Sequence, residues 1–78
     1  MSELKLVFHQ PEDIMEFVNV VQKYPYDMDM KKGRIVVDAK SLLGVMTMDI
    51  RNKVDLRIME RENEMPTIME AISPYIAA

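Results

Sequence analysis

The sequence contains no cysteine, a single histidine and only two glycines. Without cysteine the chain has neither a disulfide framework nor a thiolate metal site, and one histidine cannot form an imidazole cluster. No segment approaches the roughly 20 consecutive apolar residues of a membrane span, and the apolar run near the start is too short for a signal peptide. We therefore expect one cytoplasmic domain spanning residues 1–78, held together by packing alone, with no metal, no cofactor and no membrane contact.

Charge is distributed unevenly along the chain. The formal net charge of −3 argues against nucleic-acid binding. Residues 1–30 carry a net charge of −4, residues 31–59 carry +4, and residues 60–78 carry −3. The positive middle third surrounds Ser41 and favours acidic partners or phosphate there, although a mixed, solvated surface is an equally simple interpretation.

Four segments show the alternation of apolar and polar residues that is typical of a strand with one covered face: 4–8, 26–31, 35–38 and 54–58. The second and third are separated by a turn containing Gly33, which predicts a hairpin. The fourth, with Val54, Leu56 and Ile58 on one face, has the clearest alternation.

Two other segments have apolar residues at helical spacing. The first helix is predicted to begin at Gln10 or Pro11 and to end near Gln22 or Lys23, before Pro25. The last is predicted to begin near Pro66, with Pro74 kinking or ending it. A short helix after Ser41 completes the order β-α-β-β-α-β-α. This order predicts an α+β fold, an open-faced sandwich in which helices cover one face of a four-stranded antiparallel sheet.

The segment 38–48 combines a helix start, apolar residues and a hydroxyl. Ser41 is a good N-cap residue, and the poor helix formers that follow limit the helix to about two turns. Leu42, Leu43 and Met46 lie on neighbouring faces of so short a helix. They are either core residues or a partner surface, and the spacing does not decide between the two. Most of the methionines serve as core filler, while Met46 and Met48 are candidate contact residues.

Residues 40–48, together with the preceding hairpin and the strand at 54–58, resemble HPr, the histidine-containing phosphocarrier protein of the bacterial sugar phosphotransferase system. The resemblance implies that Ser41 matches the serine that a regulatory ATP-dependent kinase phosphorylates in many Gram-positive bacteria. It also implies that Leu42, Leu43 and Met46 form an apolar patch that docks enzyme I, sugar-specific IIA components and regulators. Lys40 and Met48 flank this patch as further candidate contacts.

The start of the first helix departs from the family. HPr proteins carry phosphate on a histidine in a His-x-Arg-Pro context, and an ungapped alignment places Gln10 at the histidine, Glu12 at the arginine and Asp13 at the proline. His9 lies one residue early, and a one-residue shift would bring it into position. Pro11 removes an amide that would bind phosphate, and the two acids would repel it.

We therefore interpret the chain as an HPr-like docking or regulatory module without histidine phosphotransfer, a phosphocarrier at most rather than an enzyme. Its expected partners are proteins of the sugar phosphotransferase system or its regulators. Phosphate on Ser41 is expected to find the positive helix end, Lys40, and Arg51 or Lys53. Two alternatives stay open: an active phosphocarrier that uses His9, and a scaffold for unrelated partners. The sequence leaves the oligomeric state open.

Overall fold

A computed structural model describes residues 2–48, 52–60 and 64–77, and its secondary structure follows the predicted β-α-β-β-α-β-α order. A short 3₁₀ helix follows the last α-helix and contains Pro74, which confirms that this proline ends the regular helix. The elements are β1 (Ser2–Leu6), α1 (Pro11–Val21), β2 (Met28–Lys32), β3 (Ile35–Asp38), α2 (Leu42–Met46), β4 (Val54–Ile58), α3 (Met65–Ala71) and η1 (Ser73–Tyr75).

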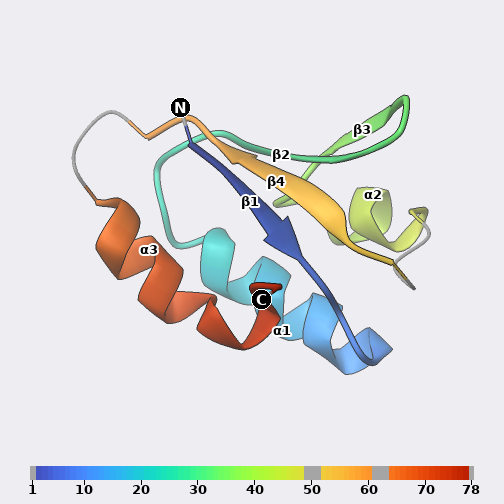
Figure 1. The fold of residues 1–78 in the computed structure, drawn as a ribbon, viewed down its shortest axis with the longest axis horizontal. Helices are drawn as coiled ribbons and strands as arrows, with labels where there is room; N and C mark the ends of the chain where they lie inside the picture. Colours follow the sequence, from blue (N-terminus) through green and yellow to red (C-terminus); the bar gives the residue numbers. More distant parts are fainter. Residues whose placement is uncertain (1, 49–51, 61–63, 78) are drawn as a thin grey trace.

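The four strands form one antiparallel sheet in the order β1-β4-β2-β3. The helices α1 and α3 lie on one face of it, and α2 lies close to β3 (Figure 1). The opposite face carries charged residues in matched rows: Lys5 opposes Asp55, which opposes Lys31. Pairs of opposite charge suit a solvated sheet face, so the predicted open-faced sandwich is confirmed.

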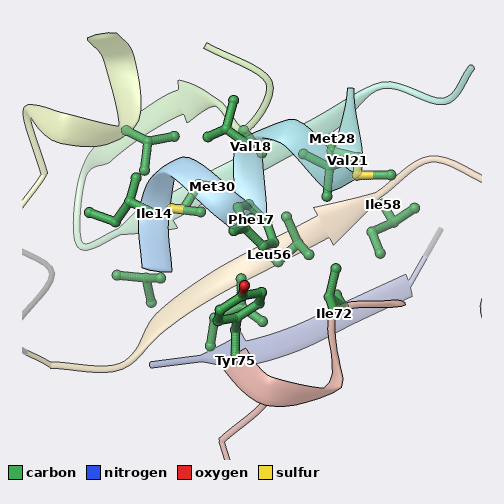
Figure 2. Packing of buried hydrophobic residues seen from close by; sticks show 14 of the residues in the cluster. Ile14, Phe17, Val18, Val21, Met28, Met30, Leu56, Ile58, Ile72 and Tyr75 are labelled. Carbon is green, nitrogen blue, oxygen red and sulfur yellow. The ribbon is translucent and has the colours of Figure 1, made fainter. Parts of the chain in front are cut away.

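The core fills the space between the sheet and the helices (Figure 2). One face of α1 contributes Ile14, Phe17, Val18 and Val21, as the helical spacing predicted. The centre of the sheet contributes the alternate residues that the strand patterns predicted to be covered: Met28, Met30, Val54, Leu56 and Ile58. Strand alternation and helix periodicity therefore specify the same core.

The first strand and the hairpin differ from the prediction. β1 ends at Leu6 rather than Phe8, because the Val7 amide donates to the Tyr75 carbonyl and the chain leaves the sheet. Phe8 is nevertheless buried, so the apolar alternation continues into a segment without a ladder. Ile35 was expected on a covered face, but it is 54% exposed because β3 is the outermost strand of the sheet. Burial at a sheet edge depends on how far the helices reach.

Candidate functional site

The N-terminal end of α1 is occupied by a carboxylate of the chain itself. Gln10 is the N-cap and Pro11 is the first helical residue, which leaves His9 exposed outside the helix. Asp13 in the first turn accepts a hydrogen bond from the His9 amide at 3.1 Å and another from Gln10 Nε2 at 3.4 Å. An acidic group at this position is stabilised by the helix dipole and satisfies a free backbone amide. The carboxylate therefore sits where a bound phosphate would be stabilised.

Three aromatic rings support this end of α1. Phe8 packs edge-on against Phe17 with ring centroids 5.4 Å apart, and Tyr75 contacts both rings. The Tyr75 hydroxyl donates to Glu16 Oε2 at 3.0 Å. Burial, and then the hydrogen bond to this carboxylate, raise the pKa of Tyr75 to about 12. The cluster joins the residue before His9, the middle of α1 and the C-terminal segment, so the position of the helix start is firmly fixed.

Ser41 is the N-cap of α2, as predicted. Its Oγ accepts a hydrogen bond from the Gly44 amide at 3.2 Å, and the Val45 amide donates to the Ser41 carbonyl at 2.9 Å. The side chain is exposed. The helix has five residues, fewer than the two turns expected, and Thr47 Oγ1 caps it by donating to the Gly44 carbonyl. An exposed hydroxyl thus lies at the start of a very short helix.

Gly44 brings α2 close to the sheet. A Cβ atom at this position would lie 3.4 Å from both Val37 Cβ and Ser41 Oγ, in van der Waals contact with each. Val45 is fully buried on the next position of the helix, and Leu42 is partly buried against the core. The short helix is therefore held by its inward face, and its outward face is free to carry other side chains.

The outward face of α2 presents two large apolar side chains. Leu43 is 81% exposed and Met46 is 56% exposed, and we call these two residues the α2 patch. Met48, expected among the contact residues, is only 5% exposed: the chain turns back into the core after α2, so this side chain is not at the surface. Leu42 is intermediate. Of the candidate contacts, only Leu43 and Met46 are mainly exposed apolar residues.

Met15 was missed by the sequence reasoning. It is 52% exposed on α1, and α1 packs against α2. The signal was present, because Met15 lies outside the apolar stripe of α1 and is therefore an apolar residue that the core does not use. It adds an exposed apolar side chain on α1, the helix that packs against α2.

Lys40 does not reach toward Ser41. Its Nζ donates to the Tyr24 carbonyl at 2.5 Å, and its own carbonyl accepts from Gln22 Nε2 at 2.9 Å. Both bonds tie the segment before α2 to the C-terminal end of α1. Lys40 is therefore not one of the cations that would lie beside a phosphate on Ser41. Of the other two expected cations, Lys53 is exposed and Arg51 lies outside the described residues.

The described residues hold neither a metal-binding cluster nor a membrane-spanning helix. Within residues 2–48, 52–60 and 64–77, no group of three or more His, Asp or Glu side chains is arranged to hold a metal ion. None of the helices in these ranges is both long and apolar enough to cross a bilayer. The candidate site therefore consists of the two helix starts and the α2 patch.

Comparison with known proteins agrees with the resemblance seen in the sequence. The family model described as "PTS HPr component phosphorylation site" matches residues 13–78, a range that begins after His9 and Gln10. No curated protein matches the chain by sequence.

Three solved structures have a similar fold. HPr-C-His from Thermoanaerobacter tengcongensis is similar with a TM-score of 0.74 and 20% identity, covering 95% of this chain and 89% of that one. Phosphocarrier protein HPr from Bacillus anthracis is similar with a TM-score of 0.73 and 18% identity, and the match covers 97% of this chain and 94% of that one. A histidine-containing phosphocarrier protein of Mycoplasma is similar with a TM-score of 0.68 and 14% identity, and the match covers 94% of this chain and 89% of that one.

Proposed function

Because the chain belongs to the HPr family of the sugar phosphotransferase system, we propose that it is a docking and regulatory member that carries no phosphate on a histidine. In this proposal the α2 patch binds a protein of that system or one of its regulators, and Ser41 is the residue whose modification changes the choice of partner. A cytoplasmic location, where HPr proteins work, belongs to the same proposal.

The observation that carries the proposal is the position of the Asp13 carboxylate. It accepts from the His9 amide, and Glu12 adds a second acid to the same turn. A phosphoryl group of about −1.5 to −2 charge on His9 would face this carboxylate at the helix start. At 4–6 Å near a surface, such repulsion costs on the order of 1 kcal/mol or more per acid. Pro11 further removes one amide that would otherwise stabilise the phosphate.

The α2 patch supports docking by apolar contact. Burying a side chain such as Leu43 or Met46 in an interface contributes about 1.5–3 kcal/mol when it is fully covered. A central apolar pair surrounded by polar residues is the usual composition of a small interface centre. The neighbouring Thr47 is exposed and polar. Lys40, just before Ser41, is hydrogen-bonded to the Tyr24 carbonyl, which connects the start of α2 to the segment after α1. The patch is therefore presented on a fixed surface.

Ser41 supports regulation through charge. Its hydroxyl is exposed and already accepts from the Gly44 amide, so phosphate oxygens can accept from the same end of α2 without unfolding it. The added charge of about −1.5 to −2 would lie beside Leu43, two residues along the chain. Partners with an acidic rim would then bind more weakly, and partners with a basic rim would bind more tightly.

Titration calorimetry with enzyme I and the sugar-specific IIA proteins of the source bacterium tests the docking surface. We expect Leu43→Glu to weaken binding by about tenfold or more, since it places a charge in the buried centre of the interface. The matched control is Met69→Glu, which makes the same kind of change at an exposed methionine of α3. Equal losses in the two variants, or full binding by Leu43→Glu, would reject the α2 patch.

Incubation with ATP and the HPr serine kinase tests the regulatory step. The wild-type chain is expected to gain one phosphate, and Ser41→Asn is expected to gain none while keeping a side-chain cap on α2. Unchanged affinity of the phosphorylated chain for every partner would contradict the proposed switch, even if the phosphate itself were found.

A further inference from the structure

The two edges of the sheet differ. The C-terminal end of the outer edge of β1 is covered by the last residues of the chain: the Val7 amide donates to the Tyr75 carbonyl, and the Ala77 amide donates to the Lys5 carbonyl at 2.9 Å. An isolated bridge between Leu6 and Ile76 completes this cover. On the other side, β3 is the last strand of the sheet, and β2 is its strand partner (Figure 1). Within the described part of the chain, no strand or bridge pairs with the outer edge of β3.

The register shows which backbone groups of β3 face outward. The Ala39 amide donates to the Met28 carbonyl, so this opposing pair is hydrogen-bonded. Hydrogen-bonded and non-hydrogen-bonded pairs alternate along an antiparallel ladder. Val37, opposite Met30, is therefore hydrogen-bonded to β2, whereas Val36, opposite Lys31, is not. The N–H and C=O groups of Val36 point to the open edge.

The residues along this edge are complementary to themselves. The segment reads Arg34-Ile35-Val36-Val37-Asp38, with a cation at one end, an anion at the other and three β-branched residues between them. Antiparallel pairing about a two-fold axis through Val36 places each Arg34 opposite an Asp38 and each Ile35 opposite a Val37. Both Arg34 and Asp38 are exposed, and Ile35 and Val36 are about half exposed.

We propose that β3 pairs with β3 of a second copy of this chain, so that two four-stranded sheets join into one of eight strands. Val36 exchanges both backbone hydrogen bonds with Val36 of the second copy, and Arg34 and Asp38 form two symmetric cross-strand ion pairs. Because the symmetry axis makes the contact isologous, this interface closes on two copies.

Charge on the open sheet face favours this occupant over other peptides. Within one chain Asp38 lies directly opposite Asp29, and like charges in opposing positions are destabilising. Arg34 of the second copy brings a cation to this pair of acids. The paired strand is only four residues long, so the dimer is weak and depends on protein concentration. The β3 edge is distinct from the α2 patch, which stays exposed in the dimer.

Charge-reversed variants tested separately and together by sedimentation velocity decide the proposal. Arg34→Glu alone places acid against acid across the two-fold axis, and Asp38→Lys alone places base against base. Each is expected to weaken the dimer by about tenfold or more. An equimolar mixture of the two restores both ion pairs between unlike chains, so dimer must reappear at close to the wild-type concentration. Because neither chain changes on mixing, misfolding of a variant cannot produce this rescue.

The matched controls make the same charge changes away from the edge. Lys23→Glu and Asp27→Lys alter exposed residues between α1 and β2, and Leu43→Glu alters the α2 patch. All three are expected to leave the dimer intact. A wild-type chain that is monomeric at millimolar concentration, a mixture that stays monomeric, or a loss of dimer in Leu43→Glu alone would overturn the proposal.

Discussion

The starts of α1 and α2 are built from the same elements but carry different side-chain groups. Each has an exposed N-cap residue and backbone amides at its first turn. At α1 the Asp13 carboxylate accepts a hydrogen bond from the His9 amide, whereas at α2 the Ser41 hydroxyl accepts one from the Gly44 amide. A carboxylate repels a phosphate by its charge, whereas a hydroxyl is a group to which a phosphate can be attached. The two helix starts therefore differ in how well each would suit a phosphate, which is the contrast on which the proposed function depends.

The two regions also differ in what supports them. α1 rests on buried aromatic rings, and α2 is held by a few inward residues while Leu43 and Met46 face solvent.

The largest expected effect tests this contrast. Phe17→Ala should destabilise the fold by about 3–5 kcal/mol, because a fully buried ring leaves a cavity. Leu43→Ala should change stability by less than about 0.5 kcal/mol. Urea denaturation measures both, and equal effects would remove the contrast.

The Tyr75 hydroxyl links the C-terminal segment to α1 through its hydrogen bond to Glu16. Tyr75→Phe should cost about 1–1.5 kcal/mol, since the hydrogen bond to Glu16 is lost. The pKa of Tyr75 is about 12 in the folded protein and near 10 in the unfolded chain. Between these values the folded state binds more protons, so its stability falls as pH rises from 10 to 12.

This part of the pH dependence should be absent in Tyr75→Phe. Denaturation at several pH values compares the variant with the wild-type chain, and the other two tyrosines provide a common background in both. Parallel curves above pH 10 would contradict the assignment of the raised pKa to Tyr75.

Removing the cap of α2 should have a somewhat smaller effect. Ser41→Ala is expected to destabilise the protein by about 1 kcal/mol, because the Gly44 amide loses its acceptor. Ser41→Asn keeps an acceptor and should be close to wild type in thermal denaturation. If the two variants were equally destabilised, the hydroxyl would have a role other than capping.

The smallest expected effect is at the start of α1. Asp13→Asn should cost about 0.5–1 kcal/mol, since it weakens the bond to the His9 amide and removes a favourable charge from the first turn. Glu12→Gln makes the same charge change in the same turn and is the control. Faster amide hydrogen exchange at His9 in Asp13→Asn, but not in Glu12→Gln, is the expected signature. Equal exchange in both would show that charge alone acts there.

Local signals predicted much of this structure. Proline and acidic residues indicated the start of α1, and Ser41 was identified as a cap from its own hydroxyl and the short helix predicted after it. The same kind of pattern did not distinguish Met48 from Met46, because their burial depends on where the chain turns after α2. The hydrogen bond from Lys40 to the Tyr24 carbonyl could not be predicted from local sequence either, since it joins residues 16 positions apart. Capping is local, and exposure is set by tertiary packing.

Phosphotransfer from phosphoenolpyruvate would show whether His9 carries phosphate. The chain is incubated with phosphoenolpyruvate and enzyme I, and acid-labile phosphate is measured beside a histidine-bearing HPr as positive control. We expect the control to be labelled and this chain not to be, because Asp13 binds the His9 amide and places a negative charge at the helix start. Labelling of the wild-type chain that disappears in His9→Ala would contradict the account and establish an active phosphocarrier.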